Sequence, residues 1–526
     1  MTGGIRAGRT ERRSEGGQPM SFNLAIMLRE SATATPGKDF LRFPSGAMTY
    51  AEVDERSGRV AVALREARLR PGDKVAVQLA NVPEFVIAYF GILKAGLTMV
   101  PLNPLLKAAE IAYHLDDSDA RMIIAHAAGA PEVTTALKEV PDVRAVVVGD
   151  LDAGTWPEGT LSFPVLLEPA DDGDIFPGAA DDTAVLLYTS GTTGRPKGAE
   201  LSHFQLYMTC TLGSERFGAE PEDVALAVLP FFHVYGLSSI LNASARHGRT
   251  ISVVPRFEVP AVLEAIQRDR VTIMAGVPTM YHALAYADTT GYDTSSLRIG
   301  SSGGAAIPEE VLRRFEEKYG IPVLEGYGLS ESASTTTVNP GADNRKILSI
   351  GKPIWGVELR IVDDQDRPLP SGQVGEIVLR GHNITKGYYK RPQETAEAFR
   401  GGWFHTGDLG YVDSDGFVFI VDRKKDLIIR GGFNVYPREV EELLYRHPAV
   451  GEAAVIGEPD ERLGEEVVAV VSLKPGASAE PDEIVAWAKE RIAAYKYPRR
   501  VRIVDELPKG ATGKIAKLEL RARLRG

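Results

Sequence analysis

Residues 188–198, "YTSGTTGRPKG", combine small and hydroxylated residues with one arginine, one proline and one lysine. Glycine adopts positive φ at little cost and lets other atoms approach the backbone, and hydroxyls add hydrogen-bond donors to the backbone N–H groups. Such a concave set of donors suits phosphate oxygens, and a lysine ammonium can follow a polyphosphate. The residues predicted to bind a nucleotide here are Thr189, Ser190, Gly191, Thr192, Thr193, Gly194 and Lys197. The segment is not a Walker A loop, because it closes on Pro-Lys-Gly rather than Gly-Lys-Ser/Thr.

A second candidate segment is "EGYGLSES", residues 325–332. Tyr327 can stack on a base and Ser330 can donate to a phosphate. Glu331 can hold Mg²⁺ directly or through water, because hard cations take oxygen ligands. The nucleotide-binding residues predicted from this segment are Glu325, Gly326, Tyr327, Gly328 and Ser330, with Glu331 as the metal ligand.

Further residues are suited to the other parts of a nucleotide. Gly303, Gly304 and Ala305 leave room for a planar ring to lie flat against the backbone. Asp408 in "WFHTGDLGY" can accept both ribose hydroxyls, and Arg423 can bind ribose or phosphate. Lys514 lies in "LPKGATGKIAK", where a mobile ammonium can reach a reacting phosphate.

One alternative is a serine hydrolase, because "GSSGG", residues 300–304, matches G-x-S-x-G with Ser302 as nucleophile. That motif requires a helix directly after the serine. Here Gly303 to Ile307 intervene before Pro308, a residue typical of a helix start, and the hydrolase interpretation leaves the phosphate loop and Lys514 without a role.

The elements that would position these residues can be predicted from the apolar pattern. "TAVLLYT", from Thr183, is a buried strand that ends at the glycine-rich segment, and residues 85–102 form a buried helix that runs into a strand. Between about residues 74 and 328, strand and helix patterns alternate, which predicts an α/β fold with a largely parallel sheet. After Asp363 the pattern becomes β-rich and antiparallel, and after about residue 426 it indicates a separate α+β domain. We therefore expect a disordered tail at 1–20, an N-terminal domain at 21–421, a hinge at 422–426 and a mobile C-terminal domain at 427–526.

Composition restricts the class of protein. The 526 residues are 44% hydrophobic and 25% charged, which is ordinary for a globular protein without a membrane span. The 71 acidic residues exceed the 60 basic ones and give a net charge of −11, which disfavours a nucleic-acid partner. Cys210 is the only cysteine, which excludes internal disulfides and thiolate metal clusters and fits a reducing cytoplasm.

Five motifs occur in one order across residues 22–520: "YTSGTTGRPKG", "PFFHVYG", "GYGLSE", "WFHTGD", and "DRKKDLIIRGG" with "ATGKIAK". Together they resemble the adenylate-forming superfamily, which contains acyl- and aryl-CoA synthetases. The resemblance implies MgATP, an acyl-adenylate intermediate and a small C-terminal domain that rotates between two half-reactions. It implies that Lys514 catalyses adenylation, that His233 lies beside the acyl carboxylate, that Lys425 is the hinge, and that Gly431 and Gly432 line a thiol tunnel.

The substrate is less closely defined by the sequence. The predicted acyl pocket consists of small or uncharged residues: His233, Tyr235, Gly236, Ser239, Gly304 and Ser332, with 333–336 beside them. No cation for a second carboxylate is evident, so a medium- or long-chain monocarboxylic acid is expected, with a coumarate-type aryl acid as the alternative. CoA is the expected thiol acceptor, and the phosphopantetheine of an acyl carrier protein is the other. The expected oligomeric state is a monomer or a dimer.

Overall fold

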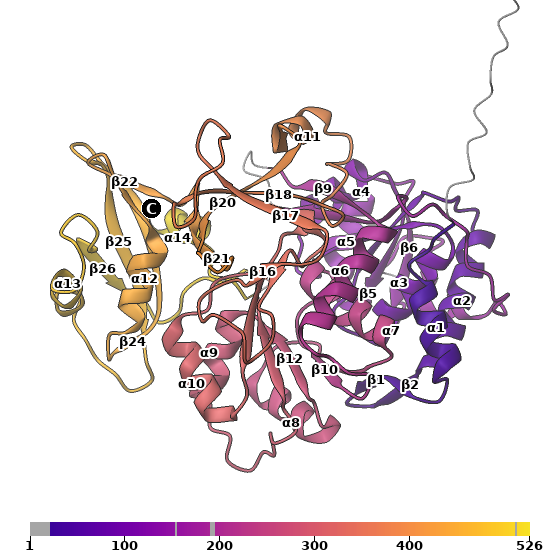
Figure 1. The fold of residues 1–526 in the computed structure, drawn as a ribbon. Coiled ribbons are helices and arrows are strands. Elements are labelled where there is room, and N and C mark those ends of the chain that lie inside the picture. The colour runs from indigo at the N-terminus through magenta and orange to yellow at the C-terminus, as the bar shows by residue number, and fades with distance from the viewer. Residues whose placement is uncertain (1–20, 153–154, 190–194, 511–512, 526) are drawn as a thin grey trace, which may run out of the picture.

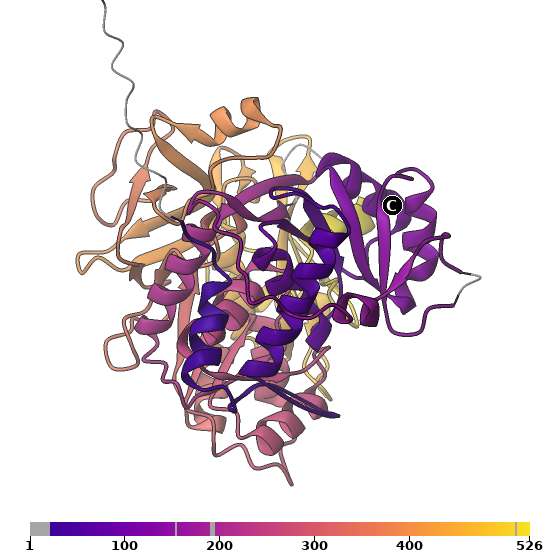
Figure 2. The ribbon, with the colours of Figure 1, turned by 90° about the vertical axis from the view of Figure 1, so that its right-hand side faces the viewer.

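The computed structural model describes residues 21–152, 155–189, 195–510 and 513–525. Within these ranges the chain forms four sheets with helices packed around them (Figure 1). A large N-terminal domain contains two parallel-rich sheets and one antiparallel sheet, and a smaller C-terminal domain contains the fourth. Figures 1 and 2 together place the C-terminal strands on the opposite side of the molecule from the first helices. The predicted mixed α/β fold is therefore confirmed.

The first sheet has seven strands, which lie in the spatial order β7-β6-β5-β3-β4-β8-β9. Its strands are β3 (Lys74–Gln78), β4 (Thr98–Pro101), β5 (Ala120–His126), β6 (Arg144–Val148), β7 (Leu161–Ser162), β8 (Thr183–Thr189) and β9 (Lys197–Ser202). The helices of this region are α2 (Tyr50–Glu66), α3 (Pro83–Lys94), α4 (Ala108–Asp117), α5 (Ala130–Leu137), η1 (Ala127–Gly129) and η2 (Phe163–Leu167).

Helix α3 and strands β4 and β8 lie where the apolar runs predicted a helix and two strands. Lys94 is the one charged residue near the end of the buried face of α3, and its side chain is completely buried. Its ammonium pairs with Asp54 of α2 at 2.7 Å, because a buried charge requires a partner. The lysine that interrupts the apolar run thus links α3 to α2.

The second sheet has nine strands, in the order β16-β15-β14-β13-β12-β10-β11-β1-β2. Its strands are β1 (Asp39–Phe43), β2 (Gly46–Thr49), β10 (Val224–Ala227), β11 (Thr250–Val253), β12 (Ile273–Gly276), β13 (Ile299–Ser302), β14 (Val323–Tyr327), β15 (Thr337–Val338) and β16 (Lys352–Pro353). Around it are α1 (Ile26–Ala34), α6 (His203–Arg216), the π-helix η3 (Tyr235–Asn242), α7 (Ala243–His247), α8 (Val259–Asp269), α9 (Pro278–Tyr286), α10 (Glu309–Tyr319) and η4 (Ser330–Ser332). The strands from β14 to β1 in this order pair in parallel, so their carboxyl ends share one edge.

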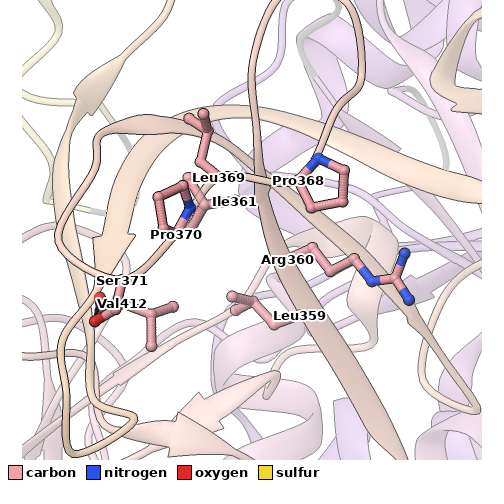
Figure 3. A pocket seen from close by; sticks show the side chains of 8 residues that line it. All are labelled: Leu359, Arg360, Ile361, Pro368, Leu369, Pro370, Ser371 and Val412. Atoms are coloured by element: carbon pink, nitrogen blue, oxygen red, sulfur yellow. Dashed lines mark hydrogen bonds between the residues drawn. The ribbon is translucent and has the colours of Figure 1, made fainter.

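The third sheet is antiparallel, as the turn-rich sequence predicts. It contains β17 (Val357–Val362), β18 (Gly375–Gly381), β19 (Phe399–Arg400), β20 (Trp403–Val412) and β21 (Val418–Arg423), with α11 (Pro392–Ala398) beside it. A surface hollow of about 400 Å³ lies on this sheet and is lined mainly by aliphatic and proline side chains. Figure 3 shows the Arg360 guanidinium pointing away from Pro370 and Ser371. None of the predicted site residues lines this hollow.

The C-terminal domain is built on the fourth sheet. Its elements are β22 (Ile428–Arg430), β23 (Phe433–Val435), α12 (Pro437–Tyr445), β24 (Val450–Asp460), β25 (Gly464–Leu473), α13 (Pro481–Lys489), β26 (Arg500–Ile503) and α14 (Lys517–Arg525). A separate apolar cluster that includes Val440, Val455 and Val471 forms its core. Lys425 lies in the turn between β21 and β22, where the third sheet ends and the fourth begins.

None of the helices in the described part of the chain combines the length and apolarity needed to cross a membrane.

Candidate active site

The glycine-rich segment joins two paired strands. β8 and β9 are antiparallel, and their last paired residues before the segment are Thr189 and Lys197. A Cβ at Gly198 would lie 2.9 Å from Leu186 Cδ1, so a larger residue at this position would displace the leucine side chain. Five of the predicted phosphate-binding residues lie outside the described residues: Ser190, Gly191, Thr192, Thr193 and Gly194. The structure thus fixes both ends of the predicted phosphate loop.

Glu331 lies against the first of these ends. Its Oε1 accepts a hydrogen bond from Tyr388 Oη at 2.9 Å and one from Thr189 Oγ1 at 3.3 Å. The Lys197 ammonium is 5.2 Å from the centroid of the Tyr388 ring, so this tyrosine contacts both the carboxylate and the phosphate-loop lysine. Carboxylate and hydroxyl oxygens are suitable ligands for Mg²⁺. The residues present therefore fit the predicted metal site.

A second group forms around Asp408, which is 5% exposed. Its Oδ2 accepts a hydrogen bond from Tyr327 Oη at 2.7 Å, and its Oδ1 is 3.3 Å from Arg423 Nε. Burial raises the pKa of Asp408, while the Arg423 guanidinium and the Tyr327 hydroxyl oppose that shift. Asp408 thus contacts both Tyr327 and Arg423, which are also predicted to bind the nucleotide.

Lys514 belongs to the C-terminal domain and lies close to Asp408 and Arg423. Gly304 has φ +82°, and a Cβ there would lie 2.7 Å from Lys514 Cε, so the absence of a side chain at 304 admits the lysine. Thr279 Oγ1 in α9 donates to the carbonyl of Gly513 at 2.7 Å and holds the adjacent backbone. Burial and the nearby Arg423 lower the pKa of Lys514 to about 8, although Asp408 acts in the opposite direction. The ammonium therefore lies beside the predicted nucleotide site with the C-terminal domain docked.

His233 is a further titratable group close to Lys514. Its Nδ1 accepts a hydrogen bond from Tyr235 N at 3.2 Å, so the neutral ring carries its proton on Nε2. Burial, and to a smaller extent the Lys514 charge, lower the pKa of His233 to about 3. The imidazole is therefore a neutral N–H donor at physiological pH, which suits it to hold a carboxylate oxygen.

The Tyr235 side chain extends from the His233 region toward Ser301 in the protein interior. Its hydroxyl lies 3.0 Å from Ser301 Oγ, and its ring packs so closely on Gly303 that a Cβ there would be 3.1 Å from Cε1. A Cβ at Gly236 would lie 2.2 Å from Pro230 O, so glycine is required where η3 begins. The π-helical form of η3 is itself typical of functional segments.

A cavity of about 40 Å³ continues from Ser301 between the nine-stranded sheet and helix α6. Ser239 also lines it, and Ser239 Oγ lies 2.9 Å from Ser334 Oγ. The remaining lining residues include Gly213, Thr335 and Arg249. The predicted pocket residue Ser239 thus borders a real cavity.

Other predicted residues have different surroundings. Ser332 is completely buried, and its Oγ accepts from Leu329 N at 2.8 Å, so its hydroxyl serves the turn at η4. The Glu325 carboxylate is buried in the protein interior near Arg438 of α12. Burial raises the pKa of Glu325 to about 7. Gly431 and Gly432 have φ of +57° and +82° in the β22–β23 hairpin. Figure 1 shows this hairpin on the outer side of the C-terminal domain.

The serine hydrolase alternative has no structural support. Ser302 is the last residue of β13 and is 1% exposed, and its hydroxyl has no hydrogen-bond partner among the described residues. The next helix, α10, begins at Glu309, so no sharp strand-to-helix turn presents the serine.

Comparison with known proteins agrees with this geometry. The chain matches the family model described as AMP-binding enzyme over residues 28–389 and the AMP-binding enzyme C-terminal domain over residues 439–514. It is 40% identical to a feruloyl-CoA synthase from Amycolatopsis sp, covering 94% of this chain and 97% of that protein. It is 36% identical to a long-chain-fatty-acid–CoA ligase from Bacillus subtilis, covering 94% of each.

Among solved structures, an anthranilate CoA ligase in complex with anthranoyl-AMP superposes with a TM-score of 0.91 at 32% identity. The match covers 97% of this chain and 98% of that one. The chain therefore belongs to the AMP-binding enzyme family and is an ATP-dependent, AMP-forming acid–thiol ligase.

Proposed function

We propose that this ligase activates an aryl acid of the hydroxycinnamate type and transfers the acyl group to CoA. The observation that carries the choice of acid is the lining of the cavity behind Tyr235, which includes the polar side chains of Ser214, Ser239 and Ser301. Such a lining suits an acid that bears oxygen substituents better than a purely alkyl chain. The similarity to a feruloyl-CoA synthase supports the same choice over the medium- or long-chain fatty acid expected from the sequence.

In the first half-reaction, a carboxylate oxygen attacks the α-phosphorus of ATP. The new C–O–P linkage forms as the bond to pyrophosphate breaks, and negative charge develops on the phosphate oxygens. Lys514 would stabilise that charge, while the neutral His233 would orient the attacking carboxylate through Nε2–H. Mg²⁺ held by Glu331 would neutralise further phosphate charge.

In the second half-reaction, a thiol sulfur attacks the acyl carbon and AMP leaves. Lys514 occupies the space beside Gly304 in the docked arrangement, so a thiol would need this domain to move. We propose that the turn containing Lys425 is the hinge and that rotation brings Gly431 and Gly432 to the thiol path. CoA is the proposed acceptor, and a carrier-protein phosphopantetheine is the alternative. Use of ATP and CoA and the single cysteine favour a cytoplasmic enzyme.

The test is ATP–pyrophosphate exchange with purified protein, run over arylpropenoic acids and over linear acids of six to sixteen carbons. We expect the highest kcat/KM with an arylpropenoic acid, and we expect free CoA, rather than holo carrier protein, to consume the adenylate. The highest kcat/KM with a long linear acid would overturn the proposed substrate class. Faster consumption by the carrier protein would overturn the proposed acceptor.

A further inference from the structure

Arg249 is a buried cation at one end of the acyl cavity. It lies between α7 and β11, is 3% exposed, and lines the cavity together with Ser214 and Phe217. Its Nη2 donates to Ser214 Oγ at 2.6 Å. Its Nε is buried without a hydrogen-bond partner among the described residues. The guanidinium therefore has donor capacity that the described part of the chain leaves unused.

The charge of Arg249 has no close counter-ion in the described part of the chain, where no carboxylate lies within 4.0 Å of it. The nearby Asp223 is already engaged, since it pairs with Arg298 at 2.6 Å and accepts from Thr272 Oγ1 at 2.7 Å. Burial lowers the pKa of Arg249 to about 10, which leaves it charged at neutral pH. A buried charge without a partner is costly, so a ligand that accepts from it is favoured.

Backbone hydrogen bonds of Arg249 hold the turn between α7 and β11. Arg249 N donates to Ser244 O at 3.0 Å, and Arg249 O accepts from Tyr50 Oη at 2.7 Å. The neighbouring Arg246 differs, because its guanidinium lies 5.2 Å from the centroid of the Tyr207 ring and it does not line the cavity. The turn is thus held by backbone contacts of Arg249 in addition to the side-chain bond to Ser214, and Arg246 provides a matched control.

Arg249 and Lys514 lie at opposite ends of the parallel strands of the nine-stranded sheet. Lys514 contacts Gly304, just beyond the carboxyl end of β13, and Ser301 in that strand lines the cavity. Arg249 precedes Thr250, the first residue of β11, so it lies at the amino edge. The two positions are separated along the strands and also across the sheet, because β12 and β10 lie between β13 and β11. The cavity spans this separation, since Ser301 of β13 and Arg249 both line it.

We infer that Arg249 recognises an oxygen acceptor at the end of the substrate remote from the reacting carboxylate. Acids with a phenolic hydroxyl, a methoxy group or a second carboxylate at that end share this chemistry. The inference rests on the acyl pocket assigned under the proposed function, and it adds the substituent that the pocket selects. It also replaces the expectation of a pocket without a cation, because Arg249 supplies one.

The experiment compares three acids of matched shape: 4-hydroxy-, 4-carboxy- and 4-methylcinnamic acid. The kcat/KM for ATP–pyrophosphate exchange is measured for the parent protein and for Arg249→Met, Arg249→Lys and Arg246→Met. For the parent protein, the higher of the two kcat/KM values for the 4-hydroxy and 4-carboxy acids is expected to exceed the value for the 4-methyl acid by about 10- to 100-fold. That ratio is the range of a charged hydrogen bond. The comparison of hydroxy and carboxy acids distinguishes a neutral from an anionic substituent.

Arg249→Met should abolish the preference, Arg249→Lys should keep part of it, and Arg246→Met should keep all of it. An equal ratio in the parent protein and Arg249→Met, or a parent preference for the methyl acid, overturns the inference. If Arg249→Met does not fold, the ratio measured with the parent protein decides. If only linear acids support exchange, the proposed aryl substrate fails separately, and ω-hydroxy, ω-carboxy and unsubstituted linear acids then test Arg249 in the same way.

Discussion

Lys514 and His233 share one site, but their surroundings favour different charges. Burial lowers the pKa of His233 to about 3, so this ring stays neutral throughout the physiological range. Lys514, with its pKa lowered to about 8 from a usual value near 10.5, is mainly protonated at neutral pH. The site therefore presents a neutral donor for the acid and a cation for the phosphate.

This difference predicts the pH dependence of adenylation. Only the protonated Lys514 can stabilise the developing phosphate charge, so kcat/KM should fall about tenfold per pH unit above about pH 8. His233 should add no change between pH 5 and 8. The measurement is the pH profile of ATP–pyrophosphate exchange, with thiol transfer from supplied acyl-adenylate as the control that lacks this loss. An exchange rate that stays flat to pH 10 would show that the Lys514 charge is not required.

At the scale of elements, helix α9 is one of the elements that hold the C-terminal domain in this arrangement. Thr279 binds the carbonyl of Gly513, one residue before Lys514, and the Lys474 ammonium lies 5.9 Å from the Tyr286 ring centroid. In addition, Arg446 directly follows α12, and its Nη2 lies 3.6 Å from Glu309 Oε2 of α10. These contacts position Lys514 from outside its own loop.

Thr279→Val should therefore weaken adenylation selectively. Loss of one hydrogen bond of about 0.5–1.5 kcal/mol predicts a roughly two- to tenfold fall in the rate of acyl-adenylate formation. Thiol transfer from supplied acyl-adenylate should not slow. Thr279→Ser, which retains the hydroxyl, is the control, and single-turnover rates are the readout. A parallel fall in both half-reactions, or an equal effect of serine and valine, would contradict the role of this contact.

The sequence predicts the elements well where one pattern is local and continuous. β8 and α3 follow from apolar runs, and β18 and β21 follow from the β-rich pattern after Asp363. Asp408, Tyr327 and Lys514 stand in short motifs that predict a nucleotide site. The contacts of Thr279, Tyr388 and Arg249 have no local signal in the sequence, because they depend on distant partners. Thr279 and Gly513 are 234 residues apart, and Tyr388 and Glu331 are 57 apart. A Gly-Arg-Thr turn gives no local signal that its arginine lines a cavity.

Ser332 has a local backbone contact that its motif does not predict. It stands beside Glu331 in a site motif, so the sequence suggested a pocket residue. Its hydroxyl instead accepts from Leu329 N at 2.8 Å and stabilises the η4 turn. Small polar residues in tight turns commonly bind their own backbone, and only the coordinates distinguish that use from ligand binding.

For the whole molecule, the docked C-terminal domain is one of the two arrangements that the proposed reaction requires. Lys425→Pro fixes φ near −65° and removes a backbone N–H in the turn between β21 and β22. Adenylation should survive this change better than thiol transfer, because Lys514 is already in place. Lys425→Ala, which keeps the backbone free, serves as the control. Single-turnover rates that fall by the same factor in both half-reactions would make Lys425 an ordinary linker residue.

Lys514 should act on the phosphate in one half-reaction and not in the other. The most direct measurement compares Lys514→Ala with the parent protein in two single-turnover assays, acyl-adenylate formation from acid and ATP, and thioester formation from supplied acyl-adenylate and CoA. The site geometry predicts that the first rate falls by about 10²-fold or more, the range for loss of a preorganised charge at a developing oxyanion, while the second is nearly unchanged. Equal loss in both assays would contradict the claim.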